Sequence, residues 1–105
     1  RLSLAEFTVR DASGAPAKTM GEELVTDSHP LIRISCRVSG HDGAPVKIRL
    51  IRNGMVIKTF ATVSPAAISY QDAFSSDRAL AYYRLEVEAG GILLVTNPLF
   101  VRRAS

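Results

Sequence analysis

Apolar and polar residues alternate along most of this 105-residue chain, a pattern typical of strands with one buried face. The alternation is clearest over residues 83–88, where apolar residues exchange places with charged ones. Gly90-Gly91 follows, and glycine reaches the positive φ values that a tight turn needs. The next four residues, Ile92–Val95, are all apolar. We therefore predict a hairpin that turns at the two glycines.

An interruption at Asn97-Pro98 follows this hairpin, and apolar residues resume over 99–101. Proline has no backbone N–H to donate to a neighbouring strand. Pro98 is therefore expected at an edge, at a bulge or at a point where a strand changes sheets.

Five earlier segments are also predicted as strands. They are 6–10, 31–39, 46–52, 55–60 and 67–72. Four of them predict an inward face made of Phe7, Val9, Ile32, Ile34, Cys36, Val38, Val46, Ile48, Leu50, Ile68 and Tyr70. Asn53-Gly54 lies between the third and fourth segments and predicts a type I′ hairpin turn, because both central residues of that turn need positive φ.

Segments rich in turn-forming residues connect these strands. Residues 11–18 and 40–45 are predicted as loops, and 63–67 as a linker that contains Ser-Pro. We interpret 19–27 as an irregular crossover rather than a helix, and 74–80 as a second crossover that leads into the strand of Tyr83.

Together these patterns predict an all-β fold, an immunoglobulin-like antiparallel β-sandwich of about seven strands. The length fits a single domain over 1–105. No apolar run approaches the roughly 20 residues of a membrane-spanning helix, so we expect no membrane partner. The chain starts at Arg1 without a methionine, and we expect it to be cut from a longer protein.

The cysteine and tryptophan content excludes an antibody-type immunoglobulin domain. The chain has one cysteine and no tryptophan, which excludes the disulfide and the core tryptophan of antibody domains. Cys36 lies in the inward phase of its strand, so we expect a buried, unreactive thiol. A single buried cysteine does not indicate a compartment, and the localisation stays open.

The formal net charge of +3 is modest, and basic residues are interleaved with acidic ones, so nucleic acid is not expected as a partner. Five basic residues share the outward phase of the predicted strands: Arg33, Arg37, Lys47, Arg49 and Arg84. We favour a solvated face, paired in part with Glu86 and Glu88, over an anion-binding strip. The two strands that carry most of these residues are expected in opposite sheets, which argues against one continuous patch.

Tyr83 is the candidate for the tyrosine corner of Greek-key sandwiches. There, a tyrosine near the start of the penultimate strand sends its hydroxyl back to an upstream backbone group. The inward phase favours Tyr83 over Tyr82 for this role. A catalytic or stacking tyrosine is the functional alternative.

Residues that could carry out chemistry do not form a recognisable set. A zinc site needs three or four ligands, and here only His29, His41 and Asp42 are available in loops. The adjacent residues Glu22 and Glu23 are expected to diverge, and no serine lies in a nucleophile elbow. We therefore assign no catalytic, cofactor-binding or metal-binding residue and expect no cofactor.

Three segments together resemble a known family. They are 20–24 (MGEEL), 50–60 (LIRNGMVIKTF) and 82–101 (YYRLEVEAGGILLVTNPLFV). Their order and spacing are similar to the C-terminal β-sandwich that follows the catalytic barrel in some bacterial PHP-type (polymerase and histidinol phosphatase) metal-dependent phosphoesterases. Leu99 and Phe100 replace the isoleucine and the hydroxyl-bearing aromatic residue of that family's closing strand. The catalytic histidines and carboxylates of the family lie on the barrel, so the resemblance implies an accessory domain alone.

We accordingly expect a non-catalytic domain that packs on or positions a neighbouring domain of the same polypeptide, with a PHP-type phosphoesterase as that neighbour. The first alternative is a carbohydrate- or surface-binding immunoglobulin-like module of a secreted protein, which would expose aromatic rings. The second alternative is a small hydrolase, which would need a site that the sequence does not show.

Overall fold

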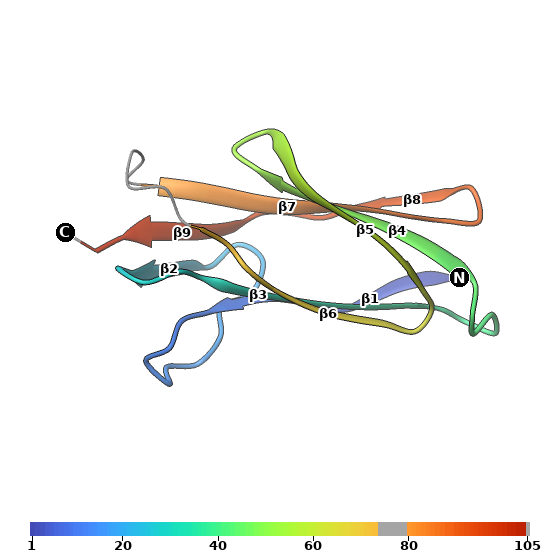
Figure 1. Cartoon of the computed structure of the whole chain (residues 1–105), viewed down its shortest axis with the longest axis horizontal. Coiled ribbons are helices and arrows are strands. Elements are labelled where there is room, and N and C mark those ends of the chain that lie inside the picture. Colours follow the sequence, from blue (N-terminus) through green and yellow to red (C-terminus); the bar gives the residue numbers. More distant parts are fainter. Residues whose placement is uncertain (74–79, 105) are drawn as a thin grey trace.

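A computed structural model describes residues 1–73 and 80–104, which form nine strands in two facing sheets (Figure 1). This part of the chain contains no helix, and therefore none that could cross a membrane. The predicted all-β, immunoglobulin-like sandwich is confirmed. The predicted crossover at 74–80 lies outside the described residues except for Leu80, which begins a strand.

The smaller sheet has three antiparallel strands in the order β1-β3-β6. They are β1 (Leu2–Arg10), β3 (Leu31–Val38) and β6 (Ala66–Gln71).

The larger sheet has the order β2-β9-β7-β4-β5, with β8 paired to β7 as well. Its strands are β2 (Glu23–Thr26), β4 (Pro45–Arg52), β5 (Met55–Val63), β7 (Leu80–Ala89), β8 (Ile92–Val95) and β9 (Leu99–Arg103). All of its pairings are antiparallel except that of β2 with β9, which is parallel.

The core lies between the two sheets and is built from the inward positions that the alternation predicts. Its fully buried side chains include Ile32, Ile34, Ile48, Leu50, Leu85 and Val87. Cys36 is buried among them, as predicted, and desolvation raises the pKa of its thiol. Ile68 and Tyr70 are only half-buried and pack at the margin of this core, where β6 forms the edge of its sheet.

Strand β1 is longer than the predicted segment 6–10, because it already pairs with β3 from Leu2 onward. A register shift between Leu4 and Glu6 breaks the alternation. Leu2 and Leu4 face the core before the shift, and Phe7 and Val9 face it afterwards. This change of phase hides the first half of the strand from a search for a period of two.

The interpretation of 19–27 as an irregular crossover was wrong for its second half, which forms β2. Leu24 and Thr26 are buried, while Glu23 and Val25 are exposed. Four residues that follow directly on a turn are too short a segment for alternation to be recognised. The pairing of β2 also depends on β9, which lies more than 70 residues away in the sequence.

Strands β8 and β9 occupy the same edge of β7 and are separated by the residues around Pro98. Thr96 fills this break: its N–H donates to the Leu85 carbonyl (3.1 Å), and its hydroxyl accepts from the Leu85 N–H (2.9 Å). The carbonyl of Pro98 accepts a hydrogen bond from Gly21 (2.8 Å). Pro98 thus lies at an interruption of an edge strand, as its missing donor predicts.

Both predicted hairpin turns are present. Asn53 and Gly54, between β4 and β5, have φ angles of 51° and 84°, as a type I′ turn requires. Gly90 and Gly91, between β7 and β8, have φ angles of 56° and 79°.

The molecule is elongated, with principal extents of 46 × 27 × 20 Å. Its N-terminus lies at the end where the β7–β8 hairpin turns, and its C-terminus lies at the opposite end (Figure 1). The turn of β4 into β5 and the start of β7 belong to the C-terminal half of this long axis, which positions the site described next.

Candidate functional site

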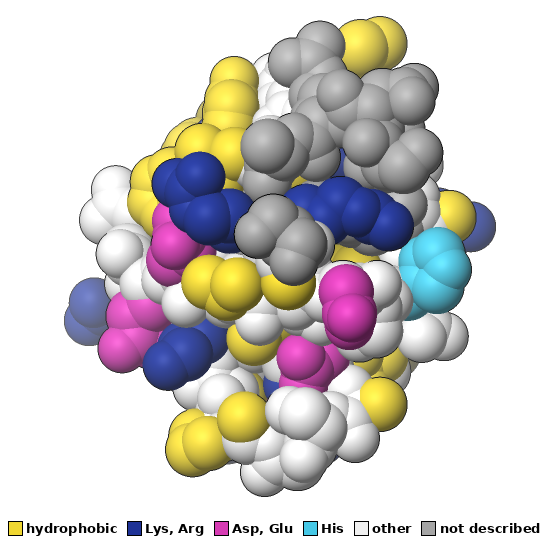
Figure 2. All heavy atoms as spheres, turned by 90° about the vertical axis from the view of Figure 1, so that its left-hand side faces the viewer, with side chains coloured by type: hydrophobic (Ala, Val, Ile, Leu, Met, Phe, Trp, Pro, Cys, Tyr) yellow, Lys and Arg dark blue, Asp and Glu magenta, His cyan; other side chains and the backbone are white. Residues whose placement is uncertain are grey.

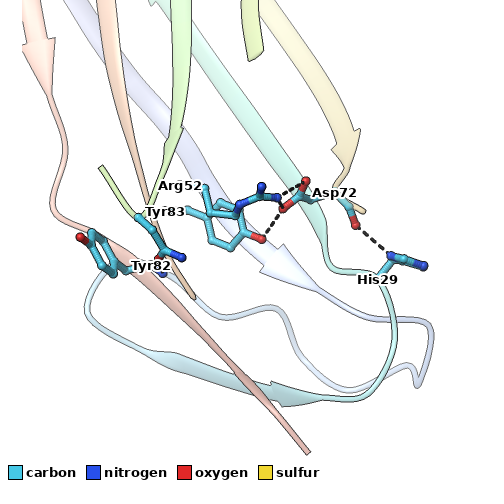
Figure 3. A network of polar contacts seen from close by, with 6 residues as sticks. His29, Arg52, Asp72, Tyr82 and Tyr83 are labelled. Carbon is cyan, nitrogen blue, oxygen red and sulfur yellow. Dashed lines mark hydrogen bonds and ion pairs between the residues drawn. The ribbon is translucent and has the colours of Figure 1, made fainter. Parts of the chain in front are cut away.

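Three polar side chains form a cluster between the two sheets (Figure 3). The carboxylate of Asp72 accepts two hydrogen bonds from one guanidinium nitrogen of Arg52, at 2.7 and 2.9 Å. It also accepts a hydrogen bond from the hydroxyl of Tyr83, at 2.5 Å. Asp72 is 3% exposed and Tyr83 is fully buried. We refer to these three residues as the inter-sheet clamp.

The inward phase of two strands of the larger sheet places two members of the clamp. Arg52 ends β4 and continues the inward row of Ile48 and Leu50, while Tyr83 faces it across the β4–β7 pairing. Asp72 comes directly after β6 and so belongs to the smaller sheet. The clamp therefore connects the sheets at one end of the core by a charged pair and a phenol.

The main chain of Asp72 is held as firmly as its side chain. Its N–H donates to the carbonyl of Pro30 (3.0 Å), and its carbonyl lies 3.1 Å from Nδ1 of His29. These contacts join the end of β6 to the segment that enters β3. The position of the carboxylate is thus fixed from both sides.

The electrostatics of the clamp favour structure over catalysis. Burial and the hydrogen bond to Asp72 raise the pKa of the Tyr83 hydroxyl, so the phenol stays protonated at neutral pH. The hydrogen bond to Asp72 likewise raises the pKa of Arg52. A general acid or base has to exchange protons near the working pH. A protonated phenol and a guanidinium that share one buried carboxylate are unsuited to that role.

The prediction for Tyr83 was right in its inward direction and wrong in its acceptor. The hydroxyl bonds to the carboxylate of Asp72 eleven residues upstream, not to a backbone group. A charged acceptor is available here because Arg52 compensates the buried carboxylate. Tyr82 points outward and is exposed, as the phase predicts.

The two histidines lie beyond opposite ends of β3, an eight-residue strand about 26 Å long at ~3.3 Å per residue. His41 belongs to the turn after β3, and the neighbouring Asp42 pairs with Arg37 (3.6 Å). His29 and His41 are therefore not brought together. Among residues 1–73 and 80–104, no group of three or more potential metal ligands lies close enough to hold an ion.

The two adjacent acidic residues diverge, as expected. Glu22 accepts a hydrogen bond from the Thr19 N–H (2.8 Å), while Glu23 pairs with Arg102 on β9 (3.2 Å). Each carboxylate thus helps to hold the β2 segment in place.

The outward basic residues fall on opposite sheets, as predicted: Arg33 and Arg37 on β3, and Lys47, Arg49 and Arg84 on β4 and β7. Arg49 contacts Glu88 (2.5 Å) and Glu86 (3.8 Å), and Arg84 contacts Glu86 (3.4 Å). The expected partial pairing with Glu86 and Glu88 is confirmed. At the end of the molecule seen in Figure 2, acidic and basic side chains also lie side by side.

The outer faces of the two sheets differ in character. The outward positions of the smaller sheet are mostly polar, with Leu31, Ala5 and Ala67 as apolar exceptions: Ser3, Glu6, Thr8, Arg10, Arg33, Ser35, Arg37, Ser69 and Gln71 are the polar ones. The larger sheet exposes apolar side chains on its outer face near the Asn53-Gly54 turn, namely Leu80, Tyr82 and Val56. We call these three residues the Tyr82 surface.

Hydrogen bonds hold Tyr82 against the neighbouring turn. The Asn53 N–H donates to the Tyr82 carbonyl (2.9 Å), and the Tyr82 N–H donates to the side-chain oxygen of Asn53 (3.0 Å). Its hydroxyl would lie 4.0 Å from a Cβ atom at Gly54. The Tyr82 surface is therefore built on two rigid strands and a tight turn.

Comparison with solved structures shows the same architecture. The chain aligns over its full length with the whole of a fibronectin(III)-like module of CbhA from Clostridium thermocellum, with a TM-score of 0.51 and 12% identity. An engineered protein aligns with 96% of this chain and 21% of its own length, with a TM-score of 0.45 and 16% identity. No protein family and no curated protein sequence matches the chain. At 12% identity the likeness concerns the fold.

The chain folds like a fibronectin(III)-like module. Alternation predicted the inward direction of Tyr83, but no role was expected for Arg52 or Asp72. The inward phase of Arg52 could have identified this residue from the sequence, because a charged side chain that points inward needs a buried partner. Nothing in the sequence pattern identifies Asp72 as that partner, since it comes from the opposite sheet.

Proposed function

We propose that this chain is a non-catalytic module that packs against a neighbouring domain of the same polypeptide and positions it. The observation that carries the proposal is the Tyr82 surface, where the larger sheet exposes neighbouring apolar side chains while the outer face of the smaller sheet is mostly polar. The fibronectin(III)-like fold supports this role, because such modules commonly serve as structural or binding units.

The path of the last strand favours a covalently attached neighbour as the occupant. Strand β9 runs beside the start of β7, with Phe100 opposite Tyr82 and Arg102 opposite Leu80. A domain joined after residue 104 would therefore begin close to the Tyr82 surface. A short tether keeps the local concentration of such a neighbour high, so a modest apolar area suffices for docking.

The resemblance of 20–24, 50–60 and 82–101 to the sandwich of PHP-type phosphoesterases makes a metal-dependent phosphoesterase our candidate for a second neighbour. In that family the barrel precedes the sandwich, so this neighbour would be joined before Arg1, at the end of the long axis opposite to the Tyr82 surface (Figure 1). That part of the proposal rests on the sequence motifs alone.

Amide hydrogen exchange of the longer polypeptide beside the isolated chain tests the docking. We expect slower exchange around Val56, Leu80 and Tyr82 only in the longer polypeptide. Replacing Tyr82 and Val56 by serine should abolish this protection, while Arg33→Ser on the opposite outer face should preserve it. Equal exchange in both proteins would refute the docking role.

A second candidate, a carbohydrate- or surface-binding module, is favoured by the exposed ring of Tyr82. An aromatic ring offers an apolar face on which a sugar can stack. Titration with soluble polysaccharides separates the two functions. Binding that survives Tyr82→Phe and is lost in Tyr82→Ser would support this second candidate over the first.

A further inference from the structure

Strand β8 forms an apolar edge of the larger sheet, at the other end of β7 from the Tyr82 surface. Ile92, Leu93 and Val95 are 51%, 56% and 55% exposed. Leu93 and Val95 lie opposite Glu88 and Glu86 and therefore project from the outer face of the sheet. Ile92 and Leu94 lie opposite Ala89 and Val87 on the inner face, where Leu94 packs against the core and Ile92 stays exposed.

The backbone of this edge has open hydrogen-bonding groups. The N–H of Thr96 faces β7, where it donates to Leu85, and antiparallel strands alternate the direction of these groups along the chain. Ile92 and Leu94 therefore also direct their N–H and C=O groups toward β7. Leu93 and Val95 direct theirs away from it. Two donors and two acceptors thus face outward.

The rest of the described chain leaves this edge open. Strand β2 covers only the neighbouring strand β9, through pairs from Glu23 with Phe100 to Thr26 with Arg103. Across residues 1–73 and 80–104, the pairing partner of β8 is β7 alone.

Proteins commonly protect edge strands with charged residues, and β8 lacks this protection. The sequence from Ala89 to Val101 contains no charged residue. The opposite edge of the same sheet, β5, carries the exposed Lys58. Pairing is thus discouraged at β5 and permitted at β8.

We propose that β8 pairs antiparallel with β8 of a second copy of this chain, forming a symmetric dimer with a continuous sheet. A twofold axis at Leu94 places Leu93 of each copy opposite Val95 of the other. The outward N–H and C=O groups of these two residues then form four hydrogen bonds. The side chains of both copies form one apolar cluster on the outer face.

The character of the edge selects a second copy as the occupant. An isologous interface requires a surface that is complementary to itself, and an uncharged strand meets this condition without like-charge contacts. The Gly90-Gly91 turn on one side and Pro98, which has no N–H, on the other confine pairing to the short segment between them. The short length available for pairing favours the register in which the twofold axis passes through Leu94.

The interface is small, so the dimer should be weak. Stable specific complexes bury roughly 1,200–2,000 Å² in total, more than two four-residue edge strands provide. We expect a dissociation constant on the order of 10⁻⁵–10⁻³ M. Sedimentation equilibrium over this concentration range measures it.

Val95→Lys is the decisive variant, and Val25→Lys is its matched control. Both valines are 55% exposed and lie on strands of the larger sheet. Val95→Lys brings like charges into the dimer and should weaken association at least about tenfold. Val25→Lys should change the dissociation constant of the dimer by no more than about twofold. Because both variants add one positive charge, a difference between them reflects the position of the lysine and not the net charge.

Residue-resolved amide exchange of the unmodified chain provides a test that needs no variant. The amides of Leu93 and Val95 should exchange more slowly as the concentration rises, whereas those of Ile92 and Leu94, already bonded to β7, should change little. A chain that stays monomeric at the highest concentration would overturn the proposal. So would equal effects of the two lysine variants, or protection of Leu93 and Val95 at every concentration, which would mean that the same polypeptide covers the edge.

This inference is independent of the docking role proposed for the Tyr82 surface. Serine at positions 82 and 56 should leave dimerisation unchanged, because these positions lie near the opposite end of β7 from β8. The two proposals can therefore fail separately.

Discussion

A carboxylate between two sheets has to be compensated, because transfer out of water is unfavourable by several kcal/mol for an unpaired charge. Asp72 meets this condition with one guanidinium and one phenol, and its own backbone is bonded to the segment before β3. At the scale of single residues, this carboxylate determines how one end of the sandwich is held.

Asp72→Ala should destabilise the fold by about 2–4 kcal/mol, because it leaves Arg52 without its counter-charge and Tyr83 without its acceptor. The lower part of this range applies because the Arg52 side chain is still 28% exposed to water. Urea denaturation of the variant and the parent chain gives the free energy of unfolding.

Asp42→Ala is the control, because the Asp42–Arg37 pair is largely exposed and should contribute less than about 1 kcal/mol. Similar losses in the two variants would show that the clamp does not contribute more than a surface ion pair.

The sequence identified only part of this clamp. Tyr83 was recognised because its inward phase and its place near the start of a strand are local features. Arg52 and Asp72 are 20 residues apart and lie in different sheets, so their pairing follows from how the sheets stack. A period of two predicts which way a side chain points and leaves its partner on the facing sheet undetermined.

At the scale of strands, prediction succeeded where alternation is continuous and failed where it is broken or brief. Strands β3, β4 and β7 were found within a few residues of their observed limits. The first half of β1 was missed because of its register shift, and β2 was missed because it has only four residues. Glycine and Asn-Gly predicted both hairpin turns, because positive φ is a local requirement.

The break between β8 and β9 depends on one side chain. The Thr96 hydroxyl accepts the buried N–H of Leu85 at 2.9 Å, where a regular strand would offer a carbonyl. Thr96→Val keeps the shape and removes this acceptor, so we expect a loss of about 1–3 kcal/mol in unfolding free energy. Thermal or urea denaturation measures it.

Thr96→Ser keeps the hydroxyl and should restore most of that loss. If valine and serine variants were equally stable, the hydroxyl would contribute nothing and the break would be held by Pro98 and its contacts alone.

For the whole molecule, stability should fall at alkaline pH. Burial raises the pKa of Tyr83 in the folded chain, and an unfolded tyrosine titrates near pH 10. A group with a raised pKa when folded stabilises the fold fully below its unfolded pKa and loses this effect as pH rises above it. We therefore expect the free energy of unfolding to decrease above about pH 10.

Tyr83→Phe isolates this contribution. The variant should be less stable than the parent at pH 7, because the hydrogen bond to Asp72 is lost, and the difference should shrink above pH 10. Cys36, whose pKa is also raised by burial, is present in both proteins and cancels in the comparison. Urea denaturation at pH 7, 9 and 10.5 measures the trend, and a constant difference would contradict the assignment.

The two ends of the chain lie at opposite ends of the long axis, and this arrangement has a mechanical consequence (Figure 1). Tension applied to both termini would pull β1 and β9 along their own directions. Each of these strands would have to slide past its neighbours, β3 on one side and β2 and β7 on the other. The hydrogen bonds of a sliding strand bear the load together, whereas those of a peeled hairpin would break one after another. The sandwich would therefore transmit a stretching force between attached domains before it yielded.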